Sequence, residues 1–185
     1  MPDLANARIL VLATDGFEQS ELLVPRDGLR ERGATVHVAA PGQTEIRGWD
    51  EDDWGQTVPV DRDLADVEPG DYDALVLPGG QINPDVLRAT DAAVALVQGF
   101  AVAGKPVAAI CHAPWLLVEA GLAEGRRMTS YASIRTDLRN AGATVVDEAV
   151  VEDRGVITSR SPADLDAFVD RIAEAVTRGG AAEAA

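Results

Sequence analysis

The sequence predicts a three-layer α/β/α sandwich built on a mostly parallel sheet. Short runs that are apolar at every position alternate along the chain with longer segments whose apolar residues recur at helical spacing. Such runs are typical of strands buried on both faces of a parallel sheet, because strands with one exposed face alternate apolar and polar residues. The alternation indicates βαβ units with right-handed crossovers.

The first third of the chain follows this pattern. Residues 8–13 form an apolar strand, and a polar turn leads into a helix at about residues 18–32, which Pro25 is expected to kink. A glycine ends the helix, and residues 35–40 make the second strand. Residues 41–61 break the alternation with several glycines, and we expect an excursion with a hairpin there.

The excursion carries an acidic cluster between two tryptophans, Trp49 and Trp54. These side chains could line a pocket, bury themselves at a subunit contact, or anchor a loop that would otherwise be mobile. The sequence does not choose between these roles.

The middle of the chain supplies the next two strands. Residues 73–77 form a strand that ends in a Pro-Gly-Gly turn, where paired glycines let backbone N–H groups face a ligand. Helices are expected at residues 84–87 and 92–103. Residues 107–110, an apolar run after Gly-Lys-Pro, form a central strand.

The last part of the chain completes a single domain of residues 1–178, and residues 179–185 are expected to be a frayed, disordered tail. The strand order should be similar to the flavodoxin-like order. We expect helices at residues 114–120, 134–140 and 164–177, an extended piece at 128–129, and strands at 144–151 and 156–159.

Composition restricts the partners. The formal charge is −15, from 31 acidic against 16 basic residues, and this charge would repel nucleic acids and anionic membranes. No apolar run is long enough for a membrane span or a signal-peptide core. One cysteine cannot form an intrachain disulfide, which agrees with a reducing compartment. We therefore expect a cytoplasmic protein.

Cys111 follows the central strand directly, and Pro114 begins the helix after it. A nucleophile on such a tight strand-to-helix turn is held clear of its neighbours, and the helix N-terminus and His112 should favour a thiolate. A lone cysteine is more often a small buried hydrophobe. Its place at the carboxyl end of a central strand, beside a histidine, favours a functional site.

Four stretches resemble the PfpI/ThiJ family of intracellular cysteine proteases or amidases. This family belongs to the class I glutamine-amidotransferase-like superfamily, which also contains the parkinsonism-associated deglycase. The order and spacing of the four stretches make the resemblance specific. They are residues 15–22 (DGFEQSEL), 73–80 (DALVLPGG), 104–112 (GKPVAAICH) and 158–165 (TSRSPADL).

The resemblance implies that Cys111 is the nucleophile, that His112 is its general base and that the Glu18 carboxyl contacts the thiol. Backbone N–H groups near Gly80 and His112 would form the oxyanion hole. It also implies a homodimer or higher homo-oligomer, because an acidic residue of a neighbouring subunit orients the histidine. Asp85 is the nearest match to that residue.

Two positions depart from the family pattern. The family has Gly after Cys-His, and this chain has Ala113, which narrows the space beside the sulfur. The family has Glu where this chain has Asp85, whose carboxylate has a shorter reach. Asp85 could also cap its own helix, because Asp is favoured at such positions.

Three functions fit these residues. The first is a cysteine hydrolase that cleaves amide or peptide bonds through an acyl-enzyme on Cys111. The second is a cofactor-free glyoxalase or deglycase, in which Cys111 adds to the aldehyde of methylglyoxal and His112 or Glu18 moves a proton to give lactate. The third is a redox-sensing or holdase-like stress protein.

The histidines narrow the choice of site. No histidine follows His112, so a glutamine-amidotransferase or papain-like triad, whose histidine comes far downstream, is excluded. His37 lies in a predicted strand, where a structural role is favoured. With no metal-ligand spacing in the chain, we expect neither a metal site nor a cofactor.

Overall fold

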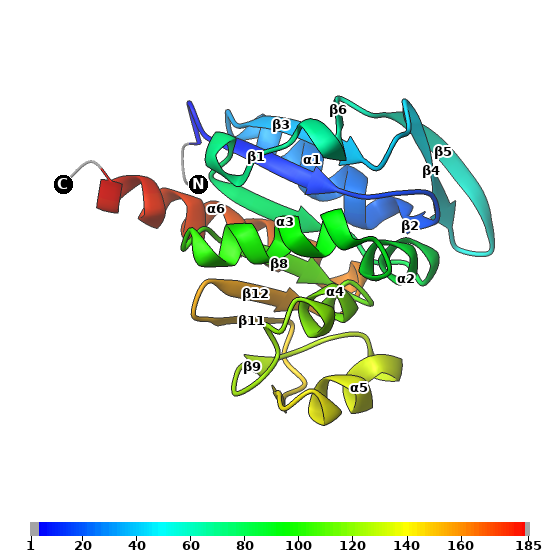
Figure 1. The fold of residues 1–185 in the computed structure, drawn as a ribbon, viewed down its shortest axis with the longest axis vertical. Helices are drawn as coiled ribbons and strands as arrows, with labels where there is room; N and C mark the ends of the chain where they lie inside the picture. The colour runs from blue at the N-terminus through cyan, green and yellow to red at the C-terminus, as the bar shows by residue number, and fades with distance from the viewer. Residues whose placement is uncertain (1–3, 184–185) are drawn as a thin grey trace.

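A computed structural model describes residues 4–183, and its centre is a seven-stranded sheet in the order β11-β12-β8-β7-β1-β3-β6 (Figure 1). All neighbouring strands pair in parallel except β11 with β12. This arrangement confirms the predicted mostly parallel, flavodoxin-like sheet. The strands in that order are Val150–Asp153, Val156–Ser159, Val107–Ile110, Ala74–Leu77, Arg8–Leu12, Thr35–Ala40 and Arg62–Asp63.

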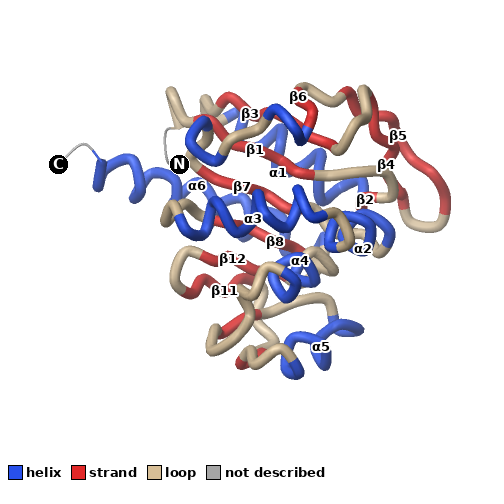
Figure 2. Tube along the Cα trace, viewed as in Figure 1, coloured by secondary structure: helices blue, strands red, loops and turns tan. Residues whose placement is uncertain are grey.

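Helices cover both faces of the sheet and make the outer layers of the sandwich (Figure 2). On one face, α1 (Gln19–Glu31) packs against α6 (Leu165–Glu183). On the other face lie α3 (Asp91–Val102) and α4 (Pro114–Glu119), and α2 (Ile82–Arg88) and α5 (Arg135–Asn140) add buried leucines to the same core cluster. The predicted three layers are confirmed.

The apolar strands form two cores because successive side chains point to opposite faces. Val11 and Val76, which pair in register, belong to the core under α1 and α6. Their neighbours Leu10 and Leu75 belong to the core under α3 and α4. All four side chains are fully buried.

Two smaller sheets stand at the ends of the main one. The expected hairpin is present as β4 (Glu45–Asp50) and β5 (Asp53–Pro59), and β4 also pairs with the short β2 (Phe17–Glu18). At the other end, β9 (Arg127–Met128) pairs with β10 (Thr144–Val145). Short 3₁₀ helices lie at Leu64–Asp66, Pro69–Asp71, Ala132–Ile134 and Pro162–Asp164.

Two predictions about the C-terminal third are wrong. Residues 144–151 are not one strand, because β10 pairs in parallel with β9 whereas β11 pairs antiparallel with β12. Helix α6 continues to Glu183, through most of the expected tail, and residues 184–185 lie outside the described residues. Within residues 4–183, none of the helices has the length and apolar character needed to cross a membrane.

Candidate active site

Cys111 stands on the predicted elbow at the carboxyl end of β8. Its backbone has a φ of +65°, a left-handed conformation that is costly for a residue with a side chain. Its N–H donates to the Ser159 carbonyl at 3.1 Å, and its own carbonyl accepts from the Tyr131 N–H at 2.9 Å. These two bonds hold the strained turn in place and direct the thiol out of the sheet edge.

The ring of His112 contacts the thiol directly. Its Nδ1 lies 3.1 Å from the Cys111 sulfur, and its Nε2 lies 3.0 Å from the Ser133 hydroxyl. Tyr131 stacks on the ring at 4.8 Å between centroids, and Trp115 meets it edge-on at 5.3 Å. Burial lowers the pKa of His112, so the imidazole is neutral near pH 7 and can accept a proton.

The carboxyl group at the thiol belongs to Glu21, which corrects the assignment to Glu18. Glu21 is fully buried, accepts a hydrogen bond from the Gly79 N–H at 2.9 Å and interacts with the Cys111 thiol. A Cβ at Gly79 would come within 2.5 Å of the Glu21 carboxyl and 2.7 Å of the Cys111 Cβ. Only glycine therefore allows the acid to approach the sulfur.

Glu18 lies one turn earlier, at the N-cap of α1, where it is half-buried and lines the pocket. Its carboxyl group accepts a hydrogen bond from the Ser20 hydroxyl at 3.4 Å. Side chains in the first turn of a helix point back toward its start, and the helix turn places Glu21 rather than Glu18 over the sheet edge.

The electrostatics of the thiol differ from our expectation. Burial and the nearby Glu21 raise the pKa of Cys111, although the backbone N–H groups of Gly80 and His112 counteract this. Burial, together with the charge of Glu18, raises the pKa of Glu21 to about 8. The acid therefore keeps its proton near pH 7, which removes the negative charge that would oppose a thiolate. The thiolate must be formed by proton transfer within the site.

The N–H groups of Gly80 and His112 both face the sulfur. Gly80 has a φ of +79°, and a Cβ there would come within 2.5 Å of the Gly16 carbonyl. The sequence therefore identified the two donors that lie at the sulfur. Their role as an oxyanion hole stays a prediction.

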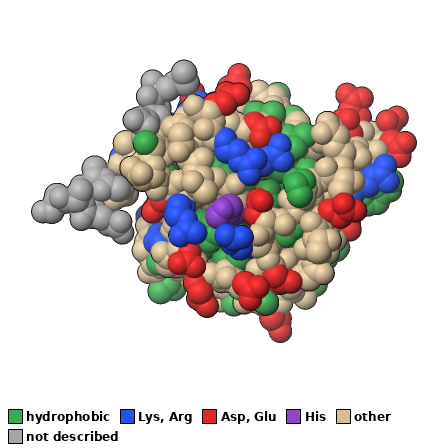
Figure 3. All heavy atoms as spheres, turned by 90° about the horizontal axis from the view of Figure 1, so that it is seen from above, with side chains coloured by type: hydrophobic (Ala, Val, Ile, Leu, Met, Phe, Trp, Pro, Cys, Tyr) green, Lys and Arg blue, Asp and Glu red, His purple; other side chains and the backbone are tan. Residues whose placement is uncertain are grey.

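A pocket of about 670 Å³ opens over the thiol. Trp49 of the β4–β5 hairpin forms one wall of this pocket. Of the three roles considered for the tryptophans, Trp49 therefore has that of lining a pocket. Trp54 contacts Trp49 edge-on and is more exposed. Acidic side chains gather at the hairpin end of the molecule (Figure 3). The pocket is lined by Gly16, Glu18, Glu21, Trp49, Glu51, Gly80, Gln81, Ile82, Cys111, His112, Tyr131 and Pro162.

Asp85 does not reach His112 within the described chain. Its carboxylate binds Arg88 at 2.5 Å, one turn along α2, and it does not cap that helix, whose N-cap is Gln81. The Arg88 guanidinium lies 4.7 Å over the Trp115 ring, which in turn contacts His112. The assignment of Asp85 to the site of a neighbouring subunit stays a prediction.

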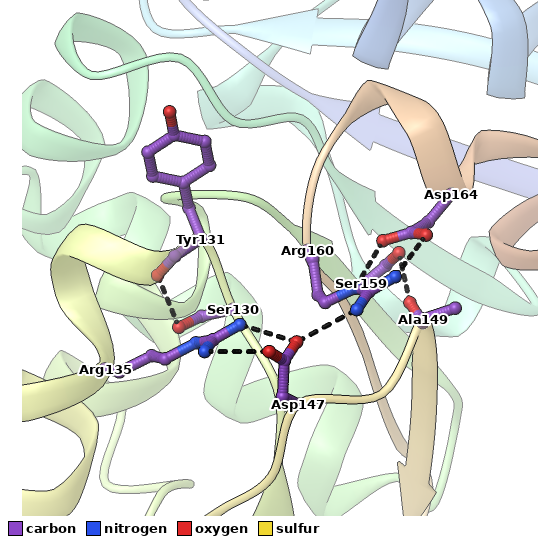
Figure 4. A network of polar contacts seen from close by, with 8 residues as sticks. All are labelled: Ser130, Tyr131, Arg135, Asp147, Ala149, Ser159, Arg160 and Asp164. Atoms are coloured by element: carbon purple, nitrogen blue, oxygen red, sulfur yellow. Dashed lines mark hydrogen bonds and ion pairs between the residues drawn. The ribbon is translucent and has the colours of Figure 1, made fainter.

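An ion-pair network lies beside the segment that carries Tyr131 (Figure 4). Arg135 binds Asp147 at 2.7 Å, and Asp147 also accepts from Arg160 at 2.9 Å. Arg160 is in turn paired with Asp164 through two bonds of 2.8 and 2.9 Å. The network links α5 to the loop before α6.

Three site residues were missed by sequence reasoning: Glu21, Tyr131 and Ser133. Glu21 stands inside one of the family-like stretches, and its place in the first turn of α1 was the available signal. Tyr131 and Ser133 follow a two-residue strand, and no local pattern distinguishes them. Among residues 4–183, His, Cys, Asp and Glu do not form a group of three or more that could hold a metal ion.

Comparison with known proteins agrees with this geometry. The model of the DJ-1/PfpI family matches residues 7–175. The chain is 43% identical over 162 residues to a deglycase of Thermococcus kodakarensis, covering 88% of this chain and 95% of the relative. It is 41% identical over 164 residues to YraA of Bacillus subtilis, named as a candidate cysteine protease, covering 88% and 94%.

The solved structure of DJ-1beta from Drosophila melanogaster has the same fold. It superposes with a TM-score of 0.82 at 32% identity and covers 95% of this chain and 96% of that one. The chain therefore belongs to the DJ-1/PfpI family. It is an enzyme of the deglycase or cysteine protease type.

Proposed function

We propose that this chain is a cofactor-free deglycase that removes methylglyoxal from early adducts and releases it as lactate. The observation that carries the proposal is the contact of 3.1 Å between the Cys111 sulfur and His112 Nδ1, beside two backbone N–H groups at the base of the pocket. Similarity to relatives named deglycase favours this activity over the cysteine hydrolase that we placed first from sequence.

The first step forms a covalent adduct on Cys111. The thiol gives its proton to His112 Nδ1, and the sulfur attacks the carbon that bears the hydroxyl and the amine in the adduct. The carbon–nitrogen bond breaks and the amine leaves with a proton, which gives a hemithioacetal. The N–H groups of Gly80 and His112 are placed to stabilise negative charge on the hemithioacetal oxygen.

The second step moves a proton between two carbons of the bound fragment. His112, neutral again after giving its proton to the leaving amine, takes the proton from the former aldehyde carbon, and the electron pair forms an enediol. The proton then returns to the neighbouring carbon, which leaves a lactoyl thioester. Water cleaves the thioester to lactate and the free thiol. One carbon of the fragment is oxidised while its neighbour is reduced, so these reaction steps need no external oxidant or reductant.

Glu21 replaces Glu18 as the proposed proton carrier. It touches the thiol and, with a pKa of about 8, holds a proton near pH 7 that it can donate to the enediol. The redox-sensor alternative is less well supported, because sensor thiols combine exposure with a low pKa, whereas Cys111 is buried and its pKa is raised.

The test is lactate release from a methylglyoxal adduct of N-acetylarginine, measured with and without aminoguanidine, which traps free methylglyoxal. A deglycase continues to release lactate when the trap is present, whereas an enzyme that acts only on free methylglyoxal stops. Cys111→Ser and Cys111→Ala should abolish the activity and keep the circular dichroism spectrum. An aminoacyl coumarin amide and a denatured protein serve as hydrolase substrates. Cleavage of these alone would overturn the deglycase assignment.

A further inference from the structure

We propose that the Ser133 hydroxyl is a positioning residue that fixes the tautomer of His112 and links the buried ring to solvent. The inference rests on the proposed roles of Cys111 and His112 in the deglycase reaction. Its basis is the 3.0 Å contact between Ser133 Oγ and His112 Nε2, on the side of the ring opposite the sulfur.

The two ring contacts together determine where the proton must sit. A neutral imidazole carries one N–H, and the nitrogen without it accepts. If Nε2 donates to Ser133, Nδ1 is left with its lone pair facing the thiol at 3.1 Å and can accept the thiol proton. After the transfer both nitrogens donate, Nδ1 to the thiolate and Nε2 still to Ser133. The hydroxyl thus serves both states of the base without moving.

The surrounding contacts hold Ser133 in this place. Tyr131, two residues earlier, is bonded through its N–H to the Cys111 carbonyl and stacks on the histidine ring. Arg135, two residues later, is anchored to Asp147. The 3₁₀ turn between these anchors carries Ser133. The turn therefore has fixed points on both sides of the hydroxyl.

Ser133 is exposed as a residue, whereas His112 is 5% exposed. The Nε2 side is therefore where the ring meets solvent, and the hydroxyl is the group through which a proton can leave or return. A neutral hydroxyl stabilises imidazolium less than a carboxylate does, because hydrogen bonds between ionised groups are stronger. The thiolate–imidazolium pair is therefore formed only in part before substrate binds.

The test uses the single cysteine and the two histidines of the chain. The rate of iodoacetamide alkylation reports on Cys111 alone and needs no substrate. For Ser133→Ala the rate near pH 7 should fall by about 2- to 10-fold, the range set by one neutral hydrogen bond. The rates should converge at alkaline pH, where bulk base forms the thiolate. Ser133→Thr keeps the hydroxyl and should keep the wild-type profile.

Nitrogen-15 NMR of the histidine rings gives the second readout. In the wild type, His112 should carry its proton on Nε2, and Ser133→Ala should lower the pKa of the ring. His37 contacts the Tyr72 hydroxyl in the same way, so Tyr72→Phe is the matched control and should move only the His37 signals.

Three results would overturn the proposal: a His112 proton on Nδ1 in the wild type, an alkylation profile unchanged in Ser133→Ala, or Ser133→Thr behaving like Ser133→Ala. Failure of the deglycase assignment looks different. In that case no variant releases lactate, while the differences in alkylation and in the NMR spectrum persist.

Discussion

The two histidines of this chain have similar partners and different settings. His112 Nε2 and His37 Nδ1 each lie 3.0 Å from a hydroxyl, of Ser133 and Tyr72 respectively. Each ring also contacts an aromatic ring, and burial lowers the pKa of both. The second nitrogen makes the difference, because in His112 it meets a thiol.

The position of each histidine relative to its strand explains this difference. His112 stands beyond the carboxyl end of β8, where the sheet edge opens into the pocket, whereas His37 lies within β3. The positive charges of Arg62, Arg8 and Arg30 act with burial to lower the pKa of His37. A hydroxyl and an aromatic neighbour therefore do not make a histidine functional. A histidine becomes functional when it lies at the sheet edge and its second ring nitrogen contacts a reactive group.

The largest expected effect comes from replacing each histidine in turn. His112→Gln should reduce the kcat/KM for lactate release by about 10²- to 10⁴-fold, because it removes the general base. His37→Gln should stay within a few-fold of the wild type, and thermal melting should show that both variants fold. An equal loss in the two variants would remove the functional distinction between the two sites.

A second comparison sets the buried Glu21 against the half-buried Glu18. The pKa of Glu21 is raised from 4.5 to about 8, so the folded state binds this proton more tightly than the unfolded chain. The protonated Glu21 therefore makes its full contribution to the free energy of unfolding below pH 4.5. This contribution, on the order of a few kcal/mol, is lost as the pH rises through about 8.

Urea unfolding at pH 5 and pH 8 checks this expectation. Glu21→Gln should flatten the decline in unfolding free energy across that interval. Glu18→Gln should change it less, because Glu18 is half-buried. A wild-type decline that persists in Glu21→Gln would show that another group is responsible.

The third effect concerns Asp85, which we propose acts on His112 of a neighbouring subunit in a homo-oligomer and shares the Nε2–H there with the Ser133 hydroxyl. Asp85→Ala should lower turnover with little change in melting temperature. Mixing it with inactive Cys111→Ala should restore part of the activity, because a mixed dimer has one site with both Cys111 and a partner Asp85.

The matched control for Asp85 is Arg88→Ala, which breaks the same surface ion pair. Exposed pairs of this kind contribute about 0.2–1 kcal/mol to stability. If Asp85 serves only Arg88, both variants should show the same small loss of stability and turnover. The shared site would also be refuted if the mixture of Asp85→Ala and Cys111→Ala proteins regained no activity after subunit exchange had been confirmed.

The smallest effect is expected at Asp147, which supports the wall beside His112. Hydrogen bonds from Arg160 and Arg135 lower the pKa of this carboxyl below 3.8. Its contribution is therefore present above pH 3.8 and is lost as the pH falls through the folded-state pKa. Asp147→Asn should melt slightly earlier than wild type at pH 7, and the difference should shrink as the pH falls below 3.8. A constant difference would point to lost packing.

Much of the fold was predictable because its signals are local. The apolar run at residues 107–110 and the Cys-His pair after it specify a buried strand and its turn, and both appear as predicted. Residues 144–151 were harder, because β10 and β11 choose partners far away in the sequence. The sequence of residues 144–151 shows no break, and the segment forms two strands only because β10 pairs with β9 while β11 pairs with β12.

The sequence by itself determined the layers of the fold and the elbow at Cys111, since both follow from neighbouring residues and strand order. The family resemblance added the expected roles of His112 and of the backbone N–H groups near the sulfur. Tertiary structure alone decided that Glu21 rather than Glu18 faces the thiol, that Ser133 meets the far side of the histidine ring, and that the pKa of Cys111 is raised. The physical reason is that these features depend on which helix turn packs on the sheet edge and on how completely the charges are removed from water.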